Sequence, residues 1–184
     1  NRLLDYHIGV LTSSYKDYSS GQKGGEGRLV GPPTVIDRKT VGGLQKLQEN
    51  LEVGTRGSAD EKFFSPVKAA LSGSLLTGHN AGFYRDDAHL AVIFITDTDD
   101  HEEDNLTPSS YYQFLLDLKK GDKNKVLSYG VFIPSTDSTC NRSGEERPQR
   151  IEEYMRIASG ISFGLCDLDY GQKLAELALD LVDK

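Results

Sequence analysis

Long apolar segments are missing from this sequence, and their absence excludes one class of protein. Nowhere in the 184 residues does an apolar run approach the roughly 18 residues of a membrane-spanning helix, so we expect no membrane span. No N-terminal signal peptide is recognisable either. The chain begins with Asn1 rather than Met, which indicates that it is processed or cut.

Basic residues are also scarce. The 21 lysines and arginines are outnumbered by 28 acids, which gives a net charge of −7, and no basic run compensates for it. Because nucleic-acid backbones are bound mainly through Lys and Arg, a nucleic-acid partner is disfavoured. Lys119, Lys120 and the region 142–150 have neighbours of both signs of charge, and we interpret them as solvated surface.

Only two cysteines occur, Cys140 and Cys166, and neither belongs to a Cys-x-x-Cys motif or lies near a pair of histidines. This pattern disfavours a zinc site. The two thiols are either reduced and structural or joined in one disulfide. Because both follow predicted strands, they can share one rim of a sheet. We therefore favour the disulfide, which implies an oxidising compartment.

The sequence signatures of several enzyme classes are missing as well. The chain has no Gly-x-Ser-x-Gly elbow, no Walker loop and no dinucleotide-binding fingerprint. Residues 21–27 are rich in glycine, but no helix pattern follows that would bind a phosphate.

What the sequence does contain is an alternation of predicted strands and helices. Runs of apolar and β-branched residues predict strands, and apolar residues at helical spacing predict helices. We expect strands over 4–12, 90–95, 125–133 and 161–165, and helices over 42–51, 63–75, 107–118, 148–159 and 174–181, with a long loop over 13–40. This order predicts an α/β fold with a mainly parallel sheet and helices on both faces. The length and the ordinary composition favour a single domain over residues 1–184.

The strand over 90–95 carries the most informative feature of the chain. Its six consecutive apolar residues predict a strand buried on both faces of a parallel sheet. It ends at Thr96-Asp97, and an acidic segment with one histidine follows over 98–104. Ligands of open α/β sheets bind beyond the carboxyl ends of the strands, and carboxylates there suit Mg2+ or Ca2+. Asp97 is therefore the leading candidate for a metal ligand, whereas the acids over 99–104 either join it or only make the loop soluble.

Together these segments resemble the von Willebrand factor type A domain. The hallmark strand of that family ends in Thr-Asp-Gly, for which Thr96-Asp97-Thr98 stands here. Residues 5–12 resemble its second strand, and residues 54–61 resemble its middle metal-binding loop, with the expected helix after it. The cysteines are similar to those of bacterial members that carry one after the fifth strand and one after the sixth. The resemblance covers nearly the whole chain and implies a three-layer, Rossmann-like fold.

The resemblance also implies a metal-ion-dependent adhesion site. Asp97 matches the acid of the third metal loop, and either Thr55 or Ser58 matches the hydroxyl of the second. The ion would be Mg2+, or Ca2+ or Mn2+, with one coordination position open to a carboxylate of a protein ligand. The first metal loop, Asp-x-Ser-x-Ser, does not follow any apolar run, and the family would place it, with the first strand and helix, before Asn1. A sheet without that middle strand would need a partner segment to complete it.

Two classes of function follow from these observations. The first, which we favour, is a metal-ion-dependent adhesion or protein-binding module that is not an enzyme. Its location would be extracytoplasmic: the periplasm, the cell surface as a bacterial lipoprotein, or the secreted fraction. The alternative is a metal-dependent phosphohydrolase that uses Asp97, Asp99 and nearby acids. Such an enzyme usually needs a Lys or Arg that binds the phosphate, and Arg85 is the nearest one upstream.

Overall fold

The computed structural model describes residues 4–15, 23–55, 57–102, 105–138, 140 and 147–182. The chain divides into two compact units, one that extends to Arg85 and one that begins at Asp86. Each unit has a small sheet and buried apolar residues of its own. The single domain over residues 1–184 stays a prediction.

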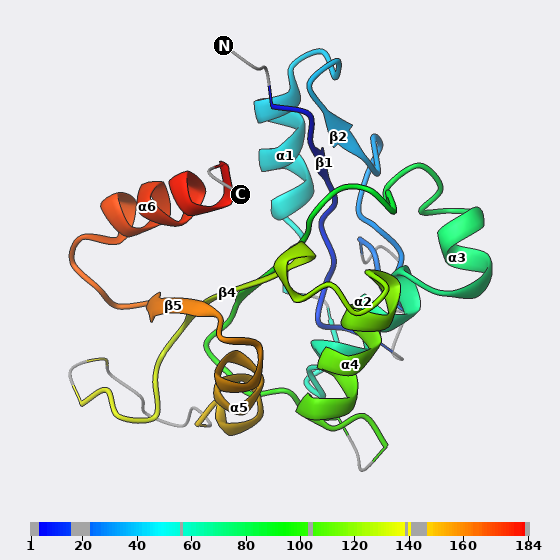
Figure 1. Ribbon diagram of the computed structural model, residues 1–184. Helices are drawn as coiled ribbons and strands as arrows, with labels where there is room; N and C mark the ends of the chain where they lie inside the picture. The colour runs from blue at the N-terminus through cyan, green and yellow to red at the C-terminus, as the bar shows by residue number, and fades with distance from the viewer. Residues whose placement is uncertain are drawn as a thin grey trace. The chain divides into compact units, whose positions relative to one another are not determined.

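The first unit combines a short antiparallel ribbon with short helices (Figure 1). Its elements are β1 (His7–Ile8), β2 (Ile36–Asp37), α1 (Gly43–Leu51), α2 (Phe64–Ala70) and α3 (Gly73–Thr77). Asn80 has no exposed surface and ties the loops of this unit together. Its side-chain oxygen accepts the N–H of Leu29 at 3.0 Å, and its amide nitrogen donates to the carbonyls of Gly27 and Ala70. A buried polar group of this kind is tolerated because its bonds are made.

The strand predicted over 4–12 is much shorter in the structure. Only His7 and Ile8 belong to a strand, β1, which runs antiparallel to β2 rather than within a parallel sheet. Pro32 and Pro33 lie upstream of β2 and have no N–H to donate to a longer ladder. The apolar and β-forming residues over 4–12 indicated a strand, but they did not reveal which segment would pair with it.

Ser58-Ala59-Asp60-Glu61 has the pattern of a capping box, which predicts the start of a helix, but no helix begins there. The Oγ of Ser58 accepts the N–H of Asp60 at 3.0 Å, which closes a local turn instead. Glu61, the other member of the predicted box, forms an isolated bridge with Ser14. The helix predicted to follow is α2, which begins only at Phe64, and a turn at 71–72 separates it from α3.

The second unit is an α/β structure built on a three-stranded parallel sheet (Figure 1). Its elements are β3 (Leu90–Ile95), α4 (Pro108–Leu118), the 3-10 helix η1 (Lys123–Lys125), β4 (Val126–Phe132), α5 (Gln149–Ala158), β5 (Ile161–Gly164) and α6 (Tyr170–Val182). The spatial order of the strands is β3-β4-β5, and helices connect them. The predicted strands and helices of this unit are confirmed, most with ends within two residues of the expected ones. The finer three-layer arrangement of the resembled family stays a proposal.

Helices α4 and α5 cover one face of this sheet. Phe94 of β3 lies edge-on to Tyr154 of α5, with ring centroids 5.5 Å apart, and Tyr111 of α4 lies 5.0 Å from Tyr154. The hydroxyls of Tyr154 and Ser128 are 2.6 Å apart, which gives the buried phenol a hydrogen-bond partner. This aromatic cluster joins both helices to β3 and β4.

Helix α6 lies on the opposite face, where the hydroxyl of Tyr129 donates to Asp180 at 2.7 Å (Figure 1). At β3 this face is open, because Ile93 and Ile95 keep 45% and 54% of their surface exposed. The prediction that this strand is buried on both faces is therefore wrong. Its position explains the difference: β3 is the outermost strand of the described sheet, and α6 contacts β5 and β4 instead.

Candidate functional site

The three parallel strands end at the same edge of the sheet, here called the carboxyl edge. The segments that leave it are residues 96–102 after β3, 133–140 after β4 and 165–169 after β5. Residues at such an edge are well placed to bind a ligand because the strands present several loops to the same region. The predicted acid Asp97 lies here.

A tight turn presents Asp97 to solvent. Thr96 is buried, and its N–H donates to the carbonyl of Val131 at 3.0 Å, which continues the β3–β4 ladder by one residue. The Oγ1 of Thr96 accepts the N–H of Thr98 at 3.0 Å and donates to its carbonyl. Asp97, between them, is exposed. Its carboxylate makes no hydrogen bond or ion pair within the described part of the chain.

Asp99, by contrast, binds the first turn of helix α5. It is only 8% exposed, and its two oxygens accept the N–H groups of Arg150 and Ile151 at 3.0–3.2 Å. These N–H groups belong to the first turn of α5 and have no partner within the helix. A carboxylate also interacts favourably with the positive end of the helix dipole. Asp99 therefore caps α5 from a position about 50 residues earlier in the sequence.

Asp100 is buried and paired with the same helix. Its side chain has no exposed surface, and its Oδ2 lies 3.0 Å from the Nε of Arg150. The guanidinium also donates to the carbonyl of Leu106 at 2.7 Å. The interpretation of Arg150 as solvated surface is therefore wrong, because its charge is part of a mostly buried ion pair. The sequence held one signal of this, two adjacent acids directly after a strand, but nothing in it identified the partner.

Glu152 ties α5 to the loop after β4. Its two carboxylate oxygens accept the N–H and the hydroxyl of Ser135 at 2.7 and 2.5 Å. No pattern in the sequence indicated this pair, because its two residues lie 17 positions apart. Asp99, Asp100 and Glu152 thus hold loops and helices together, whereas Asp97 makes no such contact in the described part of the chain.

The predicted disulfide is present in the structure and lies at the same edge of the sheet. It joins Cys140, in the loop after β4, to Cys166, in the loop after β5, and their Cα atoms are 5.7 Å apart. The expectation that both cysteines share one rim of the sheet is confirmed. Parallel neighbouring strands bring their following loops together, which is why the two cysteines can meet across 26 residues of sequence.

An ion pair next to this disulfide carries the clearest electrostatic effect at the edge. The Oδ2 of Asp167 lies 2.6 Å from the Nζ of Lys173 and accepts the N–H of Gly164 at 2.9 Å. Lys173, followed by this backbone bond, lowers the pKa of Asp167 below its usual 3.8, and Asp167 in turn raises the pKa of Lys173.

We expect this pair to contribute to stability above pH 3.8 and to lose its contribution in acid. Because the pKa of Asp167 is lower in the folded protein than in the unfolded chain, the stabilisation disappears as the pH falls through the folded value. Thermal unfolding of the wild type and Asp167→Asn should therefore differ at pH 6 and converge below pH 3.8. A difference that stays constant down to pH 2 would contradict the assignment.

The predicted metal ligands are distributed over both units. Thr55, which is exposed, and Ser58, whose N–H donates to the Oγ of Ser14 at 2.9 Å, lie in the first unit, whereas Asp97 lies in the second. Among the described residues, no three His, Cys, Asp or Glu side chains form a group that could hold a metal ion. Glu103 and Asp104 of the acidic segment lie outside the described residues. The residues around Asp97 do not by themselves form a complete metal site, so the metal stays a prediction.

In the described residues no helix is long and apolar enough to cross a membrane. No protein-family model matches the chain, and neither a curated protein nor a solved structure matches it. The function must therefore be argued from the residues at the carboxyl edge.

Proposed function

We propose that this chain is a binding module of the von Willebrand factor type A kind. Its binding surface is the carboxyl edge of the β3-β4-β5 sheet. The module belongs to an extracytoplasmic protein, and it binds a protein ligand that presents a carboxylate. A divalent cation, Mg2+ in the first place, connects that carboxylate to Asp97.

One observation carries this proposal: the carboxylate of Asp97, at the carboxyl end of β3, is exposed and has no partner among the described residues. Its neighbours Asp99 and Asp100 bind α5, and the tight turn around Thr96 holds Asp97 outward. A hard cation with few protein ligands keeps open positions and attracts an incoming acid. A single carboxylate binds weakly, so we expect an affinity at the weak end for extracellular modules, on the order of 10⁻³ M.

The same observations argue against the phosphohydrolase. That enzyme would need Asp99 as a second acid beside Asp97, but both oxygens of Asp99 accept N–H groups of α5. Arg150, a cation at this edge, is paired with Asp100. Neither side chain can turn to a substrate without releasing the start of a helix.

Two further parts of the proposal concern location and partner. The disulfide is compatible with an oxidising, extracytoplasmic compartment, since disulfides rarely persist in a reducing cytosol.

The partner includes an extended segment that pairs with β3, because β3 is the outermost strand of the described sheet and carries exposed apolar side chains. Added strands pair through the backbone groups that such an edge presents.

Replacement of Asp97 by asparagine tests the metal proposal directly. The amide keeps the size of the side chain but removes its charge. We expect Mn2+ to broaden the amide NMR signals of residues 96–98 in the wild type and excess Mg2+ to reverse the broadening. In Asp97→Asn, the Mn2+ concentration for half-maximal broadening should rise at least about tenfold, since the charged ligand is lost. Acetate should shift these signals only when Mg2+ is present.

Asp86→Asn is the matched control. Asp86 is also an exposed acid, but it lies before β3, at the opposite end of the same strand. This variant should bind Mn2+ at the carboxyl edge as the wild type does. Equal losses in both variants would mean general attraction of cations to an acidic protein and would overturn the proposal, as would unbroadened signals at 96–98.

A further inference from the structure

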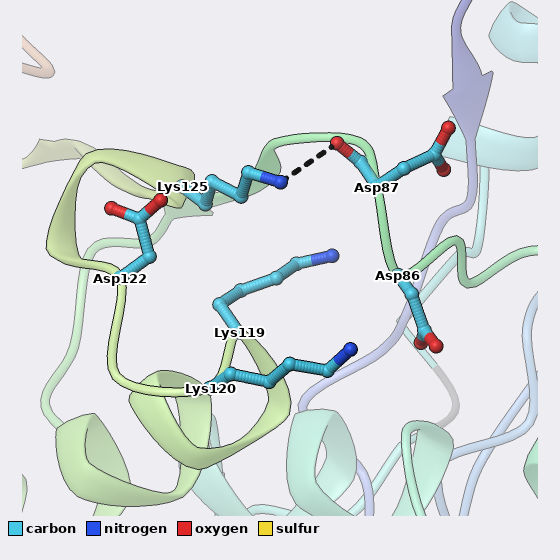
Figure 2. A pocket seen from close by; sticks show the side chains of 6 residues that line it. All are labelled: Asp86, Asp87, Lys119, Lys120, Asp122 and Lys125. Atoms are coloured by element: carbon cyan, nitrogen blue, oxygen red, sulfur yellow. Dashed lines mark hydrogen bonds between the residues drawn. The ribbon is translucent and has the colours of Figure 1, made fainter.

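A small charged cavity lies at the amino ends of β3 and β4, away from the carboxyl edge. Its volume is about 370 Å³, and it is lined by Asp86, Asp87, Lys119, Lys120, Asp122 and Lys125 (Figure 2). These residues precede the two strands: 86–87 lead into β3, and 119–125 connect α4 to β4. The cavity therefore lies within the second unit and is separate from Asp97.

The lysine side chains extend across this cavity. Figure 2 shows the ammonium groups of Lys119 and Lys120 pointing over the hollow toward the segment of Asp86 and Asp87. The Nζ of Lys125 donates to the carbonyl of Asp87 at 3.2 Å, which places a third ammonium group at the upper rim of the view. Three cations thus converge on one hollow of a protein whose net charge is −7.

The acids contribute less negative charge to the hollow than their number suggests. The carboxylate of Asp122 accepts the N–H of Asn124 at 3.0 Å, which caps η1. In Figure 2 the carboxylates of Asp87 and Asp122 point away from the ammonium groups, and that of Asp86 lies at the far rim. The centre of the hollow therefore favours a negative group.

Of the three lysines that line the cavity, Lys119 differs most from what the sequence indicated, because it is buried. It was interpreted as solvated surface, yet the residue is only 4% exposed and lies at the end of α4. Lysine is rarely buried to this degree, because removing its charge from water is costly. Its burial fixes one positive charge in the wall of the cavity.

Lys120 occupies a backbone position that glycine usually takes. Its φ is +55°, and it follows the last residues of α4, where the N–H groups of Lys120 and Gly121 donate to the carbonyls of Asp117 and Leu116. This is the pattern of a helix end whose left-handed residue favours glycine. A lysine here neutralises the negative helix end, but it could do so from a less strained neighbouring position. Its side chain at this position is therefore best explained by the cavity that it enters.

From this geometry we infer that the cavity binds the phosphate group of a small, soluble phosphate monoester. Ammonium groups act as point charges that suit a compact anion such as phosphate. The volume lies near the lower end for small-molecule sites, and six charged lining residues disfavour an apolar ligand. The inference uses neither Asp97 nor a metal, so it stands independently of the proposed function.

Titration with inorganic phosphate and with glycerol 3-phosphate, at constant ionic strength, tests this inference. We expect saturable shifts of the amide NMR signals of residues 86–87 and 119–125. Lys120→Gly should weaken binding by about two- to fivefold, as expected for the loss of one exposed charge contact. The same substitution should leave the melting temperature unchanged or raise it, because glycine suits the left-handed position. A purely structural role for Lys120 would leave phosphate binding unchanged.

Lys123→Gln is the matched control, since Lys123 is an exposed lysine of η1 that does not line the cavity. It should bind phosphate as the wild type does, and so should Asp97→Asn. Non-saturable shifts, or equal weakening by Lys123→Gln and Lys120→Gly, would overturn the inference. Binding to vesicles that contain phosphatidic acid, without binding to either soluble probe, would also overturn it and would assign the cavity to a lipid surface.

Discussion

Replacing Arg150 by methionine will lower the free energy of unfolding of the second unit by about 3–5 kcal/mol, the range for breaking a buried ion pair by removing one partner. Asp100 is the reason. Its side chain has no exposed surface, and without the guanidinium a charged oxygen would remain buried 3.0 Å from where its counter-charge was. The carbonyl of Leu106 would lose its donor as well. The helix start at the carboxyl edge would then loosen.

Urea unfolding measures this effect. The chain has no tryptophan and nine tyrosines, so near-UV circular dichroism of the buried tyrosines reports on the second unit. Arg156→Met is the matched control, because Arg156 is an exposed arginine near the other end of the same helix. It should change stability by less than about 1 kcal/mol.

The double variant Arg150→Met with Asp100→Asn separates two causes of the destabilisation. One is the loss of the attraction between the two side chains, and the other is the cost of a buried Asp100 charge without this ion pair. Removing both charges should recover part of the stability that Arg150→Met loses, because a buried carboxylate that has lost its ion pair with Arg150 is the costly species. A loss below 1 kcal/mol in Arg150→Met, or a double variant as unstable as the sum of the single ones, would contradict the buried-pair explanation.

Removal of the Cys140–Cys166 disulfide has the second large expected effect. The cross-link spans 26 residues of sequence, and in the chain-entropy model a loop of that length contributes about 3.5 kcal/mol by restricting the unfolded chain. Serine at both positions should lower the free energy of unfolding by about this amount. Heat-induced unfolding, followed with and without a reductant, measures the change.

The reductant supplies the control for the disulfide experiment. It should destabilise the wild type to the level of the double serine variant and leave that variant unchanged. A wild type with the same melting temperature in both conditions would show that the cross-link is not formed or not stabilising. Because the cysteines join the loops after β4 and β5, its loss should also alter amide NMR signals at the carboxyl edge.

Much of the second unit could be predicted from the sequence, because its signals are local. The spacing of apolar residues within each segment predicts whether it is a strand, as over 90–95, or a helix, as after Thr107. The order of strands and helices then implies parallel pairing. Thr107 also begins α4 as its side chain predicts, since its oxygen accepts the N–H of Ser110 at 3.1 Å. The first unit was harder to predict because residues 13–40 are rich in Gly, Ser and Pro and show no period.

At the carboxyl edge, too, features set by the order of elements could be predicted from the sequence, whereas contacts between residues distant in sequence could not. The sequence placed Asp97 at the end of a strand and indicated the cysteine pairing, because each depends on the order of elements along the chain. It could not separate Asp97 from Asp99 and Asp100, which are close in sequence and similar in chemistry. The partners that distinguish these acids lie on α5, about 50 residues later.

The sequence by itself thus determined the α/β character of the second unit, the position of Asp97 and the rim shared by Cys140 and Cys166. Only the tertiary structure decided which acids are committed to holding α5, that Lys119 is buried, and that one face of β3 is open. The physical reason is that local periodicity sets strands and helices, whereas burial and pairing of a charge depend on groups brought together from distant parts of the chain.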